Sequence, residues 1–202
     1  MCGQAVRVSV LLIDNHDSFT HNLAHLVRRF GHVVTVVSNS ISAVQLPSEP
    51  SHVIISPGPG TPERSRDVGS SYVALDRYLG RVPVLGVCLG HQILAHHLGA
   101  TVSRLPLVRH GVRSRLVRRG SSRLLPPEPA QPLVMRYHSL HVTPDSLPDD
   151  VHVSSVADDD DSVMSLEVPS APIFGVQFHP ESIATPDGPQ ILRSFLAVNR
   201  GE

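Results

Sequence analysis

The chain has 202 residues, of which 41% are hydrophobic and 17% are charged, and its formal net charge at pH 7 is -1. A chain of this length can bury one sizeable core, so we expect a single domain over residues 1–202. The balanced charge excludes a general electrostatic attraction to nucleic acid or to an acidic membrane surface. No stretch has the pattern of a membrane span or of a signal peptide. These features predict a cytoplasmic protein with neither a nucleic-acid partner nor a membrane partner.

The sequence contains two cysteines, Cys2 and Cys88. Because Cys2 lies at a terminus, where chains are commonly held loosely, we expect no structural disulfide. A reducing cytosol suits a free thiol at Cys88, since the thiolate form of cysteine is a nucleophile.

In the first half of the chain, apolar runs alternate with helical patterns. The run at residues 6–13 is typical of a strand buried on both faces of a parallel sheet, and the runs at residues 32–37, 52–55 and 82–87 predict three further strands. Apolar residues at helical spacing predict a helix that Asp17 or Ser18 caps and that ends at Phe30, and further helices at residues 67–79 and 89–98.

After Gly99 the segments become shorter and more alternating, which predicts a small antiparallel β layer. We expect strands at residues 101–105, 112–118 and 133–137, a hairpin of 151–156 with 163–168, a strand at 173–178 and a helix at 188–198. The acidic run at residues 158–161 is interpreted as a solvated turn rather than a metal site. The expected fold is therefore a single α/β domain, in which helices flank an open, mostly parallel sheet.

The segment around Cys88 carries the strongest chemical signal. Gly86 and Gly90 flank this cysteine in the pattern Gly-x-Cys-x-Gly, where an apolar run ends and a helical pattern begins. Such a sharp strand-to-helix turn presents a nucleophile, and the glycines remove Cβ atoms that would collide across the turn. The amides and the positive dipole end of the following helix favour a thiolate and can hold an oxyanion. The alternative is a buried core cysteine, but that interpretation gives the two glycines little purpose.

A candidate base follows the apolar run at residues 173–178. His179 and Glu181 stand there with Pro180 between them. If the run is a strand, side chains two residues apart share a face, so Glu181 can orient His179 while His179 exchanges protons with Cys88. Cysteine, histidine and glutamate form a complete nucleophilic set.

Two other features have alternative explanations. Gly58 and Gly60 in SPGPGTP free the backbone to approach a ligand, although turn formation explains them equally well. His21 and His25 share a helix face, but they have no third metal ligand nearby, so we interpret them as surface histidines.

Five segments together resemble the class I glutamine amidotransferases. They are LLIDNHDSFTHNL, ISPGPGTP, GVCLGHQ, RYHSL and FGVQFHPESI, and they occur in the family's order over almost the whole chain. GVCLGHQ and FHPE indicate the broad class. The first segment and YHSL are similar to the branch that contains the glutaminase subunits of anthranilate synthase and aminodeoxychorismate synthase.

The resemblance implies that Cys88 attacks the side-chain amide of L-glutamine through a thioester, that His179 transfers protons and that Glu181 orients His179. It implies an oxyanion hole made by the backbone N–H groups of Gly58 and Leu89. The glutamine-binding residues that it implies, besides Gly58, are Pro59, Gly60, Gln92, Ser139 and Leu140.

The resemblance also implies a partner. Ammonia would pass to a separate chorismate-binding synthase subunit that makes 4-amino-4-deoxychorismate or anthranilate. No cofactor and no metal are expected in this chain, whereas the partner subunit is expected to use Mg²⁺. The sequence departs from the family's pattern at His16, His21 and Val112, which bears on partner docking rather than on the Cys–His–Glu set.

Three alternatives stay open at this point. The chain can serve another amination partner in secondary metabolism, act as a regulatory subunit without turnover, or hydrolyse other γ-glutamyl compounds alone. The presence of Cys88, His179, Glu181 and Gln92 together argues against a subunit that has lost turnover.

Overall fold

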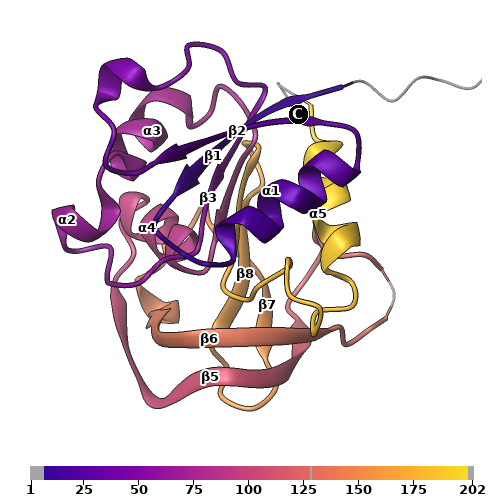
Figure 1. Ribbon diagram of the computed structural model, residues 1–202. Coiled ribbons are helices and arrows are strands. Elements are labelled where there is room, and N and C mark those ends of the chain that lie inside the picture. The colour runs from indigo at the N-terminus through magenta and orange to yellow at the C-terminus, as the bar shows by residue number, and fades with distance from the viewer. Residues whose placement is uncertain (1–6, 128, 200–202) are drawn as a thin grey trace, which may run out of the picture.

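The computed structural model describes residues 7–127 and 129–199 (Figure 1). The expectations for Cys2 and for a first strand that starts at Val6 lie outside these residues. The remaining elements can be followed in chain order in Figure 1.

A nine-stranded sheet in the order β2-β1-β3-β4-β9-β8-β7-β5-β6 forms the framework. Its parallel half contains β2 (Val33–Ser38), β1 (Ser9–Asp14), β3 (His52–Ile55), β4 (Val84–Val87) and β9 (Ile173–Val176). Its antiparallel half contains β8 (Val163–Val168), β7 (His152–Ala157), β5 (Val102–Arg118) and β6 (Leu133–Val142). The long β5–β6 ribbon crosses below the other strands in Figure 1.

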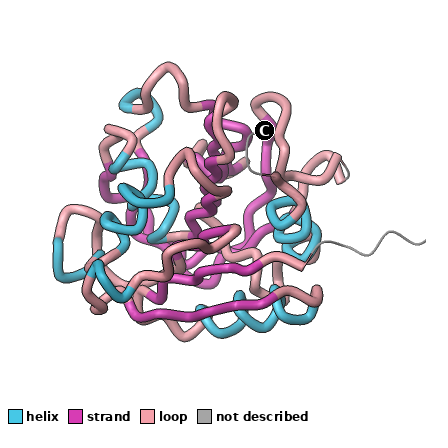
Figure 2. The backbone as a smooth tube through the Cα atoms, turned by 90° about the horizontal axis from the view of Figure 1, so that it is seen from above, coloured by secondary structure: helices cyan, strands magenta, loops and turns pink. Residues whose placement is uncertain are grey.

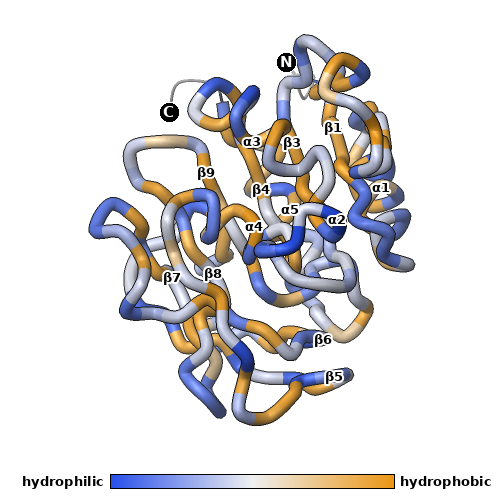
Figure 3. The backbone as a smooth tube through the Cα atoms, turned by 90° about the vertical axis from the view of Figure 1, so that its left-hand side faces the viewer, coloured by the Kyte–Doolittle hydropathy of each residue, from blue (hydrophilic) through white to orange (hydrophobic). Residues whose placement is uncertain are grey.

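Helices cover both faces of the parallel half, as the view from above shows (Figure 2). The helices of one face are α1 (Thr20–Arg29) and α5 (Gly188–Leu196), and those of the other are α3 (Ser71–Tyr78) and α4 (Leu89–His97). Successive residues of β1 alternate between the two cores, because Leu12 packs on the α1 side and Leu11 and Ile13 on the α3 side. Figure 3 accordingly shows β1 and β9 as hydrophobic strands inside the molecule.

The predicted fold class is confirmed. The order of the five parallel strands, 2-1-3-4-9, is that of a flavodoxin-like doubly wound sheet, which binds ligands at the carboxyl ends of its strands. The predicted hairpin of β7 and β8 is present, and Ile191, Leu192 and Phe195 of α5 face the core as their spacing indicated.

The predicted helix over residues 67–79 is wrong in one respect, because the chain forms two helices there. These are α2 (Ser65–Val68) and α3, separated at Gly69, where φ is +48°. A Cβ at residue 69 would lie 2.1 Å from the backbone oxygen of Asn39. This close approach bends the chain although the apolar spacing continues across it.

The predicted cap of the first helix is also wrong. Neither Asp17 nor Ser18 caps α1, which begins after Phe19 without a side-chain cap. Asp14 at the end of β1 organises this loop instead: its carboxylate accepts hydrogen bonds from the backbone N–H of His16 (2.9 Å) and the hydroxyl of Thr20 (2.8 Å).

Strand boundaries differ in the second half of the chain. The two strands expected at residues 101–105 and 112–118 form one strand, β5, whose pairing with β6 shifts between Arg104 and Arg109. β6 extends beyond Tyr137 to Val142, and β9 ends at Val176 rather than at residue 178. Two 3-10 turns, Ala43–Gln45 and Pro144–Ser146, complete the described elements.

The acidic run at residues 158–161 is only partly a solvated turn. Asp158 and Asp161 are exposed, whereas the side chain of Asp160 is 18% exposed and pairs with Arg109 and Arg136. Asp159 also pairs with Arg109 and Arg136. The prediction therefore holds for Asp158 and Asp161 and is wrong for the two aspartates between them.

Within the described parts of the chain, no helix combines the length and the apolar character that crossing a bilayer requires.

Acidification is expected to destabilise the fold through His91 of α4, which is fully buried. Burial, and then repulsion from His138 when that ring is also protonated, lower the pKa of His91 to about 3, whereas a histidine in the unfolded chain has a pKa near the ordinary value of 6.5. The unfolded chain therefore binds a proton that the folded chain does not. The stabilisation is complete above about pH 6.5 and is lost as the pH falls toward 3.

At pH 5 this difference corresponds to about 2 kcal/mol of unfolding free energy. Urea unfolding at pH 7 and pH 5 measures it on the wild type, on His91→Gln and on the exposed control His25→Gln. The loss on acidification should be about 2 kcal/mol smaller in His91→Gln than in the other two proteins. An equal loss in all three proteins would contradict this assignment.

Candidate active site

Cys88 occupies the sharp turn between β4 and α4. Its backbone has φ 53° and ψ -105°, a conformation that residues with a Cβ rarely adopt. The flanking glycines are needed there, since a Cβ at Gly86 would lie 2.4 Å from the oxygen of Gly90, and a Cβ at Gly90 would lie 2.1 Å from the oxygen of Ile55. The predicted nucleophile elbow is thus present, with the thiol at the carboxyl edge of the parallel sheet.

His179 and Glu181 lie in the loop after β9. The His179 Nδ1 and a carboxylate oxygen of Glu181 are 2.5 Å apart, and both side chains are buried. The strand ends at Val176, so the shared strand face expected from the sequence is not what joins them. They meet in a tight turn, in which the backbone N–H of Ser182 donates to the oxygen of His179.

The backbone and ring of His179 are held from several sides. Its N–H donates to the oxygen of Met135 on β6 (3.0 Å), and its own oxygen accepts from the hydroxyl of Thr185 (2.8 Å). The rings of Tyr137 and Phe19 pack against the imidazole edge-on, with centroids 5.1 Å and 5.5 Å away. These four contacts were not predicted from the sequence, although Phe19 and Tyr137 belong to the motifs LLIDNHDSFTHNL and RYHSL.

The charges around His179 favour the protonated form of its imidazole. Burial opposes a charge on His179, but the neighbouring Cys88 and Glu181 outweigh it and hold the pKa of the imidazole well above its usual range. Its Nε2 is buried without a hydrogen-bond partner among the described residues. This nitrogen is therefore free to exchange a proton with the thiol or with a bound group.

A pocket of about 140 Å³ opens beside the thiol. It brings together the residues expected to bind glutamine or to form the oxyanion hole, namely Gly58, Pro59, Gly60, Leu89, Gln92, Ser139 and Leu140. Cys88, Tyr137 and His138 complete its lining. The β3–α2 loop, the start of α4 and the middle of β6 thus form one concave site.

The glycine loop on one side of the pocket is tightly packed. A Cβ at Gly58 would lie 2.6 Å from the backbone oxygen of Asn15 and 2.9 Å from the side chain of Leu89. Gly60 has φ +101°, and a Cβ there would lie 2.3 Å from the carboxylate of Asp67. These glycines therefore allow close packing against the protein's own backbone and side chains. The approach of this loop to a ligand stays a prediction.

Gln92 reaches across the floor of the pocket. Its amide nitrogen donates to the oxygen of Leu140 and to the side-chain oxygen of Gln177, both at 3.0 Å. The amide of Gln177 in turn lies 3.7 Å from the sulfur of Cys88. Gln177 lies within FGVQFHPESI, but its place in the site was not predicted.

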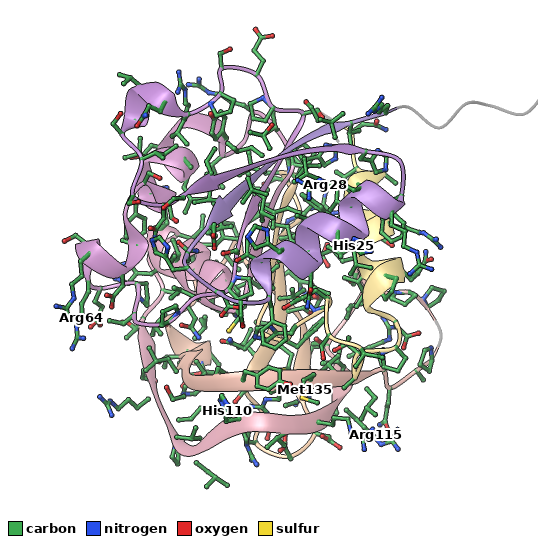
Figure 4. The ribbon with its side chains drawn as sticks, viewed as in Figure 1. His25, Arg28, Arg64, His110, Arg115 and Met135 are labelled. Carbon is green, nitrogen blue, oxygen red and sulfur yellow. The ribbon has the colours of Figure 1, made fainter. Side chains whose placement is uncertain are left out.

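The remaining candidates lie outside the pocket. His21 and His25 are exposed on α1, and Figure 4 shows His25 on the same helix as Arg28. The described residues contain no cluster of three or more histidine, cysteine or acidic side chains suited to a metal ion. Among the departures from the family pattern, His16 is exposed with φ 63°. Val112 lies on β5, two residues after His110, which Figure 4 labels. The ring of His110 contacts Tyr137 at 5.3 Å.

A cysteine at a strained strand-to-helix turn, a buried histidine–glutamate pair beside it and a pocket at the carboxyl edge of a parallel sheet define the class of cysteine-dependent α/β enzymes. The comparisons with known proteins narrow this class. Residues 11–198 match the family described as Glutamine amidotransferase class-I.

Two relatives match over most of their length. Anthranilate synthase component 2 of Saccharolobus solfataricus is 41% identical over 196 residues, which cover 92% of this chain and 96% of that protein. Aminodeoxychorismate synthase component 2 of Escherichia coli is also 41% identical, with 93% and 98% covered. A crystal structure of a candidate GMP synthase protein from Thermoplasma acidophilum has a TM-score of 0.84 at 25% identity and covers 96% of this chain and 94% of its own. The chain belongs to the class I glutamine amidotransferase family.

Gly90→Ala tests whether packing holds the elbow. The new Cβ meets a backbone oxygen of β3, so α4 must move and carry Cys88 with it. We expect a loss of more than about 3 kcal/mol in urea unfolding and slower alkylation of Cys88 by iodoacetamide, measured in a Cys2→Ser background. Gly80→Ala is the matched control because φ there is +72° and nothing lies within 4 Å of the new Cβ. It should cost only about 1 kcal/mol, so equal effects of the two substitutions would show that packing at the elbow is unimportant.

Proposed function

We propose that the chain is the glutamine-hydrolysing subunit of a chorismate-utilising synthase. The single observation that carries the proposal is the position of Cys88, which lies between the buried His179–Glu181 pair and a pocket lined by the predicted glutamine-binding residues. The names of the two relatives, both second components of synthases, support the choice of partner.

In the proposed reaction the thiol proton of Cys88 passes to His179, and the sulfur attacks the side-chain carbonyl carbon of L-glutamine. The N–H groups of Gly58 and Leu89 would stabilise the oxyanion, a contribution of about 3 kcal/mol for each donor. The C–N bond breaks as His179 gives its proton to the leaving nitrogen, which produces ammonia and a γ-glutamyl thioester. His179 then takes a proton from a water molecule as the water oxygen attacks the thioester carbon. The C–S bond breaks, glutamate is released and the proton passes from His179 to the sulfur, which restores the thiol. Glu181 holds the imidazole in orientation throughout.

The ammonia would be consumed by a separate chorismate-binding subunit, in the cytoplasm. Its product would be 4-amino-4-deoxychorismate or anthranilate, since one relative is named for aminodeoxychorismate synthase and the other for anthranilate synthase. We assign no cofactor to this chain and propose that Mg²⁺ belongs to the partner.

Cys88→Ser is expected to abolish formation of the aminated product from glutamine while the partner's synthesis from ammonium salts stays intact. The loss should exceed a factor of about 10³, because a serine hydroxyl is a far weaker nucleophile at this site. The measurement is product formation by the mixed subunits with glutamine or with ammonium. Loss of both activities would contradict the proposal, because it would mean that the substitution damages the complex and not the glutamine step.

A second experiment tests which synthase subunit the chain serves. Glutamate release is measured for the chain alone and for the chain mixed with each type of synthase subunit from the same organism. Strong stimulation by one subunit identifies the pathway. Rapid hydrolysis of γ-glutamyl peptides by the isolated chain, without stimulation by either subunit, would favour a stand-alone thiol hydrolase instead.

A further inference from the structure

We propose that Arg136, clamped by the acidic turn between β7 and β8, is a positioning residue for the pocket wall at residues 138–140 and acts through His138. The inference rests on the proposed function and deepens it, because it concerns how the chain binds glutamine. The evidence is a continuous set of hydrogen bonds that begins at the turn and ends in the pocket.

Arg136 is the starting point of this set. Its side chain is completely buried on β6, where an unpaired charge would be strongly unfavourable. All the guanidinium nitrogens donate hydrogen bonds, which matches the full donor capacity of an arginine. The partners are Asp159 (2.9 Å), Asp160 (2.8 Å), Ser114 (3.0 Å), Ser162 (3.3 Å) and His138 (3.0 Å).

The bond from Arg136 fixes the state of His138. An arginine Nε–H can only donate, so Nε2 of His138 must accept, and the proton of the neutral ring must lie on Nδ1. Nδ1 then donates to the oxygen of Leu140 at 2.8 Å. Burial, and then the charge of Arg136, lower the pKa of His138 to about 4, which keeps the ring neutral at physiological pH.

The oxygen of Leu140 is where the set enters the pocket. It accepts from His138 and from the amide of Gln92, and all three of these residues line the pocket. The two bonds hold the backbone between residues 138 and 140 from two sides. This segment includes Ser139, the exposed residue of the wall.

The acidic turn is held at its other side by β5. Arg109 pairs with Asp159 at 3.1 Å and with Asp160 at 3.0 Å, so two aspartates balance two arginines. One carboxylate oxygen of Asp160 accepts from both arginines, and the other accepts from the backbone N–H of Ser162. An asparagine cannot replace this carboxylate, because its NH₂ group would face a donor in either orientation.

The test compares Asp160→Asn with Asp161→Asn, two adjacent positions of the same turn. Asp161 is exposed and pairs with the exposed Arg119, and its φ of 54° suits asparagine. Steady-state glutaminase activity is measured in the synthase complex, together with alkylation of Cys88 by iodoacetamide in a Cys2→Ser background. We expect Asp160→Asn to raise the KM for glutamine about tenfold or more, with kcat and the alkylation rate changed less than about threefold. Asp161→Asn should match the wild type.

His138→Gln tests the same step without unpairing a buried charge, and it should also raise KM. A second readout is the ¹⁵N NMR spectrum of the histidines, in which His138 should show a protonated Nδ1 in the wild type and a mixture of tautomers in Asp160→Asn. Glutamine binding is also measured on Cys88→Ser and on the double variant Cys88→Ser/Asp160→Asn. The dissociation constant of the double variant should be higher by the same factor as KM rises in Asp160→Asn.

Two results would overturn the inference: an unchanged KM in Asp160→Asn and His138→Gln, or equal losses of kcat and of alkylation, which would indicate general damage. Failure of the proposed function looks different, because the wild-type complex would then release no glutamate from glutamine.

Discussion

The backbone of Cys88 is held in a conformation that costs about 1–3 kcal/mol for a residue with a side chain, and the rest of the site depends on it. Hydrogen bonds on both sides of Cys88 stabilise this conformation. The N–H of Cys88 donates to Val176 of β9 (2.9 Å), while its oxygen accepts from Gln92 one turn into α4 (3.1 Å). The absence of a Cβ at Gly90 lets α4 pack against the end of β3, where the N–H of Gly90 donates to the oxygen of Ser56 (3.2 Å). The register of three parallel strands therefore determines where the thiol points.

β9 joins the two halves of the sheet, and this explains why the site lies where it does. On one side it pairs in parallel with β4, which carries Cys88, and on the other it pairs antiparallel with β8. The loop after β9 carries His179, whose backbone N–H donates to the oxygen of Met135, the residue of β6 that Figure 4 labels. The thiol thus comes from the parallel half, and the pocket wall comes from the antiparallel half. The imidazole is anchored to both.

Residue type and periodicity were sufficient to predict the parallel strands and the two places where Cys88 and His179 follow them, whereas the pocket residues were expected only from the family resemblance. Two apolar runs stop at reactive side chains. From these stops the sequence predicts the end of a strand at Cys88 and the start of a loop at His179. The break at Gly69 could not be predicted, because Val68 and Tyr72 keep helical spacing and the break depends on a contact with Asn39, which is distant in sequence. Likewise the His179–Glu181 contact was expected for the wrong local reason, since a turn brings side chains two residues apart together as well as a strand does.

The role of the acidic turn was missed for a different reason, although a signal existed. In β6 the buried residues alternate, and this alternation places Arg136 on the same inward face as Val134. A buried arginine requires a counter-charge, and the acidic run is the densest group of carboxylates in the sequence. Reading the turn by itself made solvation the natural interpretation. The inward position of Arg136 and the acidic run, considered together, would have predicted their ion pairs.

The pairing of Arg136 is a weak device for stability, because the cost of removing charges from water offsets much of the attraction between them. Apolar side chains of similar volume would fill the same space on β6 without that cost. Apolar side chains could not, however, donate hydrogen bonds in fixed directions. The guanidinium plane fixes Nε2 of His138 as an acceptor, and the opposite nitrogen of the same ring then directs the oxygen of Leu140. In a pocket of about 140 Å³ a small rotation of that peptide changes which groups face the ligand. Geometry at the pocket therefore accounts for the buried charges better than stability does.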